Sequence, residues 1–256
     1  MNQSAHELPS HSVSRSYLLE AKFEFLKLVR TTAFAVPALL FTPLFYLLFG
    51  ILIARGQGGE AARYLLWTYA VFGVAGNGLF SFGVTVALER DQGFLRYKRA
   101  LPMPPGAYLC AKMLMASMFA FVTISLLAVL AASVGKVSMT PMQWIILFAL
   151  NIVGVLPFCA LGLWIGTLTS GQGAPAVVNL IYLPMAFLSG LMLPLSILPK
   201  FLQTLAPVWP SFHLSQIGLS VIGKHVGGSL WVHAAFLLIV TVVFSWLAIR
   251  RLARSN

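Results

Sequence analysis

Long runs without a charged residue divide this sequence, and they set the class of fold. A helix must extend over about 20 residues to cross a hydrocarbon core of roughly 30 Å. Four uncharged runs of 23 to 25 residues meet that length, between Arg30 and Arg55, Arg63 and Glu89, Lys112 and Lys136, and Lys224 and Arg250. Each run predicts one membrane-spanning helix.

The composition supports a membrane protein and excludes an ordinary soluble enzyme. Hydrophobic residues make up 59% of the 256 residues and charged residues only 9%, whereas a soluble domain has about 25% charged residues. The 17 basic residues outnumber the acidic ones, but they lie at the ends of apolar runs, as membrane topology requires, so nucleic acid is not expected as a partner. Cys110 and Cys159 match neither a disulfide framework nor a metal knuckle.

A further uncharged run extends from Val137 to Pro199 and, with 63 residues, is too long for one helix. Small polar residues, glycine and proline at 169–175 predict a tight turn between two spans. The sequence therefore predicts an all-α integral membrane protein with one transmembrane domain over residues 14–256, after a disordered tail at 1–13. The six expected spans lie near residues 33–53, 64–88, 113–134, 144–168, 175–193 and 231–249.

The segment Phe201–Gly223 is also uncharged, but we do not expect it to cross the membrane. It contains Pro207, Pro210 and several polar side chains. Proline leaves backbone groups without partners, and hydrocarbon offers none. A re-entrant or interfacial element before the last span is the better interpretation.

The distribution of basic residues predicts the orientation. With both termini in the cytoplasm, the inner segments carry 12 lysines and arginines and the outer segments carry five. The positive-inside rule therefore favours two cytoplasmic termini.

Residues Ser14–Arg30 predict an amphipathic helix. Glu20, Glu24 and Lys27 recur at i, i+4 and i+7 and share one face, while apolar residues occupy the other. We expect this helix to lie in the inner membrane interface, with its lysines reaching water. A simple membrane anchor would show the same pattern.

The inventory of reactive side chains excludes most enzyme classes. No carboxylate follows Asp91, so most of the chain lacks the acids needed for glycoside hydrolysis or two-metal chemistry. His213, His225 and His233 are 12 and 8 residues apart, which does not place two metal ligands on adjacent helical turns. Residues 218–225 resemble a phosphate-binding loop, but His225 stands where serine or threonine is required. We expect no catalytic residue, no metal and no bound nucleotide in this chain.

The longest internal charged segment, Glu89–Lys112, carries a resemblance to a known family. It is similar to the first cytoplasmic loop of type-2 ATP-binding-cassette (ABC) exporter permeases, which show an E-x-E/D-x-G-T-L-E pattern, then L-x-x-x-P and a lysine entering the next span. Phe94 and Arg96 depart from the usual threonine and glutamate. The matching residues are Glu89, Asp91, Gly93, Leu95, Pro102 and Lys112.

A second resemblance lies in the fifth expected span. Residues 187–194 read F-L-S-G-L-M-L-P and are similar to the family's F-x-S-G-x-x-x-P element, with re-entrant helices behind it. The resemblance extends from about Ser14 to Arg254.

This resemblance implies a membrane subunit that works as a homodimer, or with a closely related permease, in the plasma membrane of a bacterium. Two separate ABC ATPase subunits would bind ATP and magnesium, so this chain would need no cofactor of its own. The amino-terminal helix and the first cytoplasmic loop would contact the ATPase, and a short helix at about 105–111 would dock on it. The coupling residues would be Glu89, Arg90, Asp91, Gly93, Pro102, Pro105 and Lys112.

Two polar stripes indicate a cargo pathway between the second and fifth spans of two protomers. One stripe is formed by Asn77, Ser81 and Thr85, and the other includes Asn179, Tyr182 and Ser189. Small polar residues also join helices to one another, and this alternative stays open. The mostly apolar spans favour a lipophilic or amphiphilic cargo, such as a drug-like molecule, a lipid or a linked glycan, with membrane lipids as neighbours.

Two observations leave the interpretation open. Gly162 and Gly166 form a G-x-x-x-G pair in the fourth span, which favours close packing within the chain or across a dimer equally. A membrane-embedded enzyme, or a channel or assembly scaffold without an ATPase, is the alternative to an exporter subunit.

Overall fold

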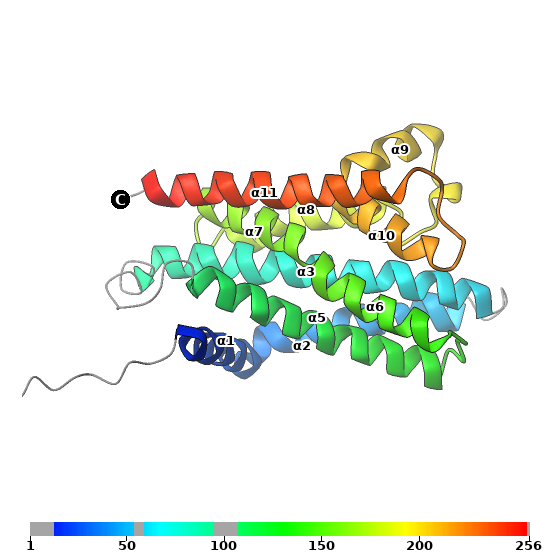
Figure 1. Cartoon of the computed structure of the whole chain (residues 1–256), viewed down its shortest axis with the longest axis horizontal. Coiled ribbons are helices and arrows are strands. Elements are labelled where there is room, and N and C mark those ends of the chain that lie inside the picture. The colour runs from blue at the N-terminus through cyan, green and yellow to red at the C-terminus, as the bar shows by residue number, and fades with distance from the viewer. Residues whose placement is uncertain (1–12, 54–58, 95–106, 255–256) are drawn as a thin grey trace, which may run out of the picture.

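The computed structural model describes residues 13–53, 59–94 and 107–254, and every regular element in these ranges is a helix (Figure 1). The elements are α1 (Val13–Arg30), α2 (Thr32–Phe45), the π-helix η1 (Tyr46–Leu52), α3 (Gly59–Asp91), α5 (Ala107–Ser133), α6 (Pro141–Gly154), α7 (Leu156–Leu168), α8 (Ala174–Leu188), the 3-10 helix η3 (Leu195–Ile197), α9 (Lys200–Leu205), the 3-10 helix η4 (Ala206–Val208), α10 (Pro210–Ser220) and α11 (Leu230–Arg254). The expectation of an all-α membrane protein is confirmed.

Four helical segments in the described ranges are long and apolar enough to cross a membrane: Gly59–Asp91, Tyr108–Ser133, Pro141–Leu168 and Leu230–Arg254. Two shorter apolar helices, Ala38–Leu52 and Ala174–Leu188, lie where the first and fifth spans are expected. Four of the six expected spans thus coincide with a helical segment long enough to cross, and the total of six stays a prediction.

The fifth expected span ends five residues earlier than its apolar composition suggests. Helix α8 ends at Leu188 and is followed by Gly190 with φ of 79°. The Gly190 N–H bonds to Phe187 O at 3.3 Å, and the Leu191 N–H bonds to Ala186 O at 3.2 Å. These two bonds form a Schellman motif, which satisfies the last carbonyls and stops the helix.

The fourth span is broken in its middle. Helix α6 ends at Gly154 and α7 begins at Leu156, with Pro157 next to the junction. Proline has no N–H to continue the ladder of hydrogen bonds, so the helix bends there. At its start, Thr140 and Gln143 form a capping box with reciprocal bonds of 3.1 and 3.3 Å.

Helix α3 is the centre of the bundle, and α11 lies on its periphery. In the most apolar window of each helix, 83% of α3 residues are buried but only 22% of α11 residues. Glycines let α7 approach α3 closely: a Cβ placed on Gly162 would lie 2.8 Å from the Leu79 carbonyl oxygen, and one on Gly166 would lie 2.8 Å from the Gly83 oxygen. The G-x-x-x-G pair therefore packs inside one chain.

The segment between α8 and α11 forms short helices. The longest, α10, has 11 residues, which at about 1.5 Å per residue crosses roughly half of a hydrocarbon core. It is buried and packs against α3 and α11. These lengths agree with the prediction that Phe201–Gly223 does not span the membrane.

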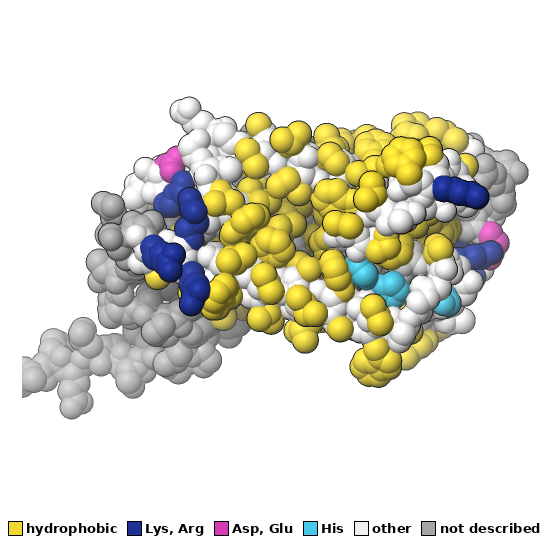
Figure 2. All heavy atoms as spheres, turned by 90° about the horizontal axis from the view of Figure 1, so that it is seen from above, with side chains coloured by type: hydrophobic (Ala, Val, Ile, Leu, Met, Phe, Trp, Pro, Cys, Tyr) yellow, Lys and Arg dark blue, Asp and Glu magenta, His cyan; other side chains and the backbone are white. Residues whose placement is uncertain are grey.

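One end of the bundle collects most of the described basic side chains, and we call it the basic end. Helices α3, α7 and α11 end there, α5 begins there, and α1 lies there across the long axis of the bundle (Figure 1). Lysines and arginines gather at this end beside a broad apolar surface (Figure 2). The two described chain ends therefore lie at the same end, as an even number of crossings requires.

Candidate functional site

A set of charged and polar side chains joins α1, α3 and α5 at the basic end. We call it the charged cluster, and it consists of Glu24, Lys27, Thr85, Glu89, Tyr108 and Lys112. A charge that is buried near the membrane is stable only when it is paired and hydrogen-bonded. The charged cluster meets this condition, because its side chains come from three helices and are paired and hydrogen-bonded with one another.

Lys112 is the centre of the charged cluster. Its side chain is 0% exposed, and its Nζ lies 3.3 Å from Glu24 Oε2 and 3.2 Å from Glu89 Oε1. It also donates to Thr85 Oγ1 at 3.0 Å. One ammonium group therefore donates to side chains of both α1 and α3. Its removal would leave two buried carboxylates without this partner.

Glu89 connects the cluster to the surface. Besides Lys112, it accepts hydrogen bonds from Lys27 Nζ at 2.7 Å and from the Tyr108 hydroxyl. The Lys27 side chain is 57% exposed, whereas that of Glu89 is 4% exposed. Because Lys27 belongs to α1 and Tyr108 to α5, the Glu89 carboxylate joins the end of α3 to both of these helices.

The structure adds a tertiary contact to the expectation about α1. The sequence predicts an interfacial helix with Glu20, Glu24 and Lys27 on one face, and its place in the membrane interface stays a prediction. In the structure Glu24 is buried and pairs with Lys112, while Leu19 and Phe23 are exposed. The reason is that Lys112 offers a buried partner, which a helical pattern cannot reveal. Glu20 belongs to α1, but its side chain lies outside the described residues.

Arg90 and Asp91 hold the turn between α7 and α8. The Arg90 guanidinium donates to the carbonyls of Thr167 and Thr169, each at 2.6 Å, and to Gly166 O at 3.2 Å. These carbonyls end α7 and would otherwise lack intrahelical partners. Asp91 Oδ2 accepts from the Gly171 N–H at 2.6 Å. The end of α3 is thus fixed to the fourth and fifth spans as well.

The rest of the expected coupling loop is only partly described. Gly93 has φ of 76°, a conformation that glycine adopts without strain, and it follows the end of α3. Pro102, Pro105 and Leu95 lie outside the described residues. From Ala107 on, α5 is continuous to Ser133, so the described part of the expected docking helix at 105–111 is the first turn of the third span.

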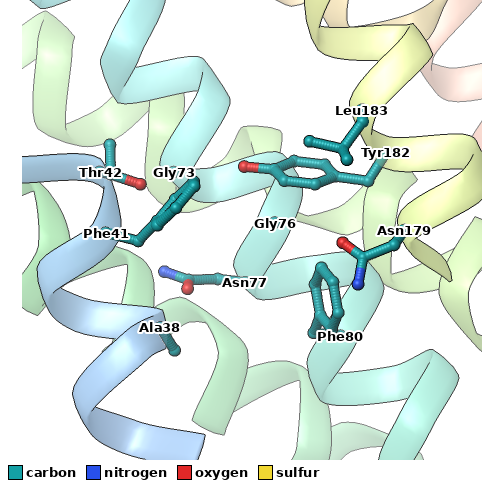
Figure 3. A pocket seen from close by; sticks show the side chains of 10 residues that line it. All are labelled: Ala38, Phe41, Thr42, Gly73, Gly76, Asn77, Phe80, Asn179, Tyr182 and Leu183. Carbon is teal, nitrogen blue, oxygen red and sulfur yellow. The ribbon is translucent and has the colours of Figure 1, made fainter. Parts of the chain in front are cut away.

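A pocket of about 410 Å³ lies between α2, α3 and α8 (Figure 3). Asn77 of α3 and Asn179 of α8 line it, and so does the ring of Tyr182 (Figure 3). The Tyr182 hydroxyl donates to Phe72 O at 3.0 Å, which fixes the ring. The remaining lining residues are Ala38, Phe41, Thr42, Gly73, Gly76, Phe80 and Leu183.

The structure separates the residues of the two polar stripes. Asn77 lines the pocket and also donates to Thr123 Oγ1 on α5 at 3.0 Å, while Thr85 belongs to the charged cluster. Ser81 and Ser189 are buried and do not line the pocket. The stripe on α3 therefore joins helices at two of its positions, Asn77 and Thr85. Of the six residues in the two stripes, three line the pocket: Asn77, Asn179 and Tyr182.

Sequence reasoning missed several residues that the structure brings to these sites. Tyr108 lies one helical turn before Lys112, so it shares the face that carries the lysine. Thr42 and Phe41 lie in the first span, where an apolar pattern gives no sign of a pocket. Gly73 and Gly76 let neighbouring side chains approach α3 closely: a Cβ on Gly73 would lie 2.9 Å from Thr123 Cγ2, and one on Gly76 would lie 2.9 Å from the Tyr182 hydroxyl oxygen.

Histidines form a pair away from these sites. His213 Nδ1 and His233 Nδ1 lie 2.8 Å apart, and His213 Nε2 lies 2.8 Å from Pro207 O. Burial lowers the pKa of His213 below its usual range. Within the described ranges, no group of three or more His, Cys, Asp or Glu side chains could hold a metal ion.

Comparison with known proteins agrees with this architecture. The sequence profile of the family described as "ABC-2 type transporter" matches residues 16–222. The chain is also 26% identical over 228 residues to the Bacillus subtilis (strain 168) protein named "Putative transport permease YvfS", covering 88% of this chain and 92% of that protein. The profile match includes both the charged cluster and the pocket. The chain is therefore a multi-pass transport subunit of the membrane and belongs to the ABC-2 type transporter family.

Proposed function

We propose that this chain is the membrane subunit of an ATP-driven exporter, works as a dimer, and is powered by separate ABC ATPase subunits. The single observation that supports this most is the charged cluster, which joins α1, α3 and α5 at the basic end. In this proposal the basic end faces the cytoplasm of a bacterium, the ATPase docks there, and ATP and magnesium are bound by the ATPase alone.

The proposed coupling follows from the length and rigidity of α3. The ATPase contacts α1 and the loop after Gly93, and Lys27–Glu89 and Glu24–Lys112 transmit the movement to α3 and α5. Gly73 and Asn77 lie 12 to 16 residues before Glu89 on the same helix, or roughly 20 Å away at 1.5 Å per residue. A tilt of α3 at the basic end therefore changes the shape of the pocket.

The proposed cargo is lipophilic or amphiphilic. The pocket is lined mainly by aromatic and aliphatic side chains, and only Thr42, Asn77, Asn179 and the hydroxyl of Tyr182 offer polar atoms. Such a surface suits an apolar body with few hydrogen-bonding groups. In a dimer, the exposed face of α8 would bring two such pockets toward a shared pathway.

Glu89→Gln tests the coupling. The amide cannot pair with Lys27 and Lys112 as a carboxylate does, so we expect a subunit that inserts and assembles normally while ATP hydrolysis no longer drives export. The measurement is ATP hydrolysis and efflux by the permease–ATPase complex in proteoliposomes. Glu60→Gln is the matched control, because Glu60 is exposed at the opposite end of α3. Normal efflux with Glu89→Gln would contradict this role of the cluster.

Asn179→Leu tests the pocket. Asn179 is exposed and lines the pocket, so leucine removes a polar contact for cargo without emptying a packed core. We expect altered cargo stimulation of ATP hydrolysis, of about tenfold in half-maximal concentration if one hydrogen bond is lost. Leu180→Met, on the same helix but outside the pocket, should leave it unchanged. Failure of Asn179→Leu to assemble would favour a role in joining helices instead.

A further inference from the structure

A groove of about 460 Å³ lies at the basic end, between α7 and the last turns of α11. Two tryptophans and three arginines dominate it, and its lining consists of Trp164, Trp246, Leu247, Arg250, Arg251 and Arg254. It is separate from the pocket that faces α2 and α8, with which it shares no residue.

The arginines of this groove have no anionic partner in the described part of the protein. Arg250 lies over the ring of Trp246, with Cζ 3.8 Å from the ring centroid, and Arg251 Nε donates to Thr167 O at 3.2 Å. Neither α7 nor α11 contains an acid. The nearby end of α3 supplies Asp91, which pairs with Arg90 and accepts from the Gly171 N–H. Among the described residues, the positive charge of the groove is therefore not compensated by an acid.

The surface next to the groove is apolar and faces outward. Val242, Val243 and Ile249 of α11 are exposed at 59%, 43% and 51%, and Figure 2 shows basic side chains at the end of the molecule beside a broad hydrophobic surface. Tryptophan is typical of the level of the lipid headgroups. Positive charge, tryptophan and an exposed apolar helix thus follow one another in the order of a phospholipid's headgroup, glycerol region and acyl chains.

We propose that this groove binds an anionic phospholipid, with the phosphate between Arg250 and Arg254 and an acyl chain along α11. Guanidinium groups bind phosphate oxygens in a bidentate manner, and basic pockets between helices on the cytoplasmic side bind anionic headgroups. The lipid comes from the inner leaflet, and this assignment of the leaflet rests on the proposed orientation. Arg251 contributes less, since it also caps the end of α7.

The test uses the delipidated full-length chain in detergent, and native mass spectrometry to measure the affinity for phosphatidylglycerol and for phosphatidylcholine. We expect the anionic lipid to bind more tightly. Arg250→Gln with Arg254→Gln should reduce this preference by roughly 30-fold if each arginine contributes as basic residues do near an anionic surface. Lys136→Gln with Lys200→Gln, which removes two charges from the opposite end, should preserve it.

Each remaining outcome decides against the proposal. Equal binding of the two lipids by the unaltered chain would overturn it, and so would an unchanged preference in the double arginine variant. Displacement of phosphatidylglycerol by inorganic phosphate at similar concentrations would assign the groove to a free anion. These measurements need no ATPase and no cargo, so they can fail while the exporter function holds.

Discussion

Replacing Lys112 with methionine is expected to destabilise the protein by about 3 to 5 kcal/mol, the range for breaking a buried ion pair on one side. The substitution leaves Glu24 and Glu89 buried beside an apolar side chain, with the central ammonium gone. Methionine has nearly the same length, so the loss reflects charge rather than volume. Unfolding in mixed detergent micelles, followed by tryptophan fluorescence or circular dichroism, measures it.

Two control variants separate charge from packing at this site. Lys112→Met combined with Glu24→Gln removes one of the stranded carboxylates, and we expect it to regain part of the lost stability. Lys136→Met, at an exposed position three residues after the end of α5, should have little effect. A loss for Lys112→Met no larger than that of a surface ion pair, about 0 to 1 kcal/mol, would contradict the central role of this lysine.

Replacing Gly162 with alanine is expected to destabilise the contact between α3 and α7 by about 1 to 3 kcal/mol, as overpacking of a well-packed core does. The new Cβ would lie 2.8 Å from Leu79 O and 3.0 Å from Leu79 Cα. Both atoms belong to the backbone, so no side-chain rotation can relieve the clash, and the two helices must separate. Thermal unfolding in detergent is the measurement.

Gly59→Ala is the matched control for that substitution. A Cβ at Gly59 meets nothing within 4 Å, and alanine favours the helical conformation, so stability should stay the same or rise slightly. If Gly162→Ala leaves the thermal stability of the monomer unchanged but reduces dimer formation, the G-x-x-x-G pair would serve association between chains instead of packing within one.

The positions of the four long apolar helices could be predicted because charged residues are excluded from the middle of such helices. Asp, Glu, Lys and Arg are costly in hydrocarbon, so charged residues such as Arg63 and Glu89 mark where α3 enters and leaves. The turn at 169–175 could be predicted from local sequence as well, because glycine and proline favour turns whatever the tertiary packing. It is confirmed by the interval between Leu168, which ends α7, and Ala174, which begins α8.

The candidate site was only partly predictable, because it depends on contacts between distant residues. The sequence indicated Glu89 and Lys112 but could not show that they meet each other and Glu24, which is 88 positions from Lys112. The same limit applies to Arg90, whose partners on α7 lie 76 to 79 positions away. Helical periodicity tells which residues share a face, but the neighbour of that face is decided by tertiary packing.

The proposed function depends most on an ATPase that docks at the basic end, and site-specific photocrosslinking tests this docking directly. A photoreactive amino acid would replace Lys22 on α1, Phe94 after α3, or Trp231 at the opposite end of the molecule, in cells that express the chain with its natural partners. All three positions are exposed. We expect Lys22 and Phe94 to form adducts with an ABC ATPase subunit and Trp231 to form none. An ATPase adduct from no position, or equally from Trp231, would contradict it.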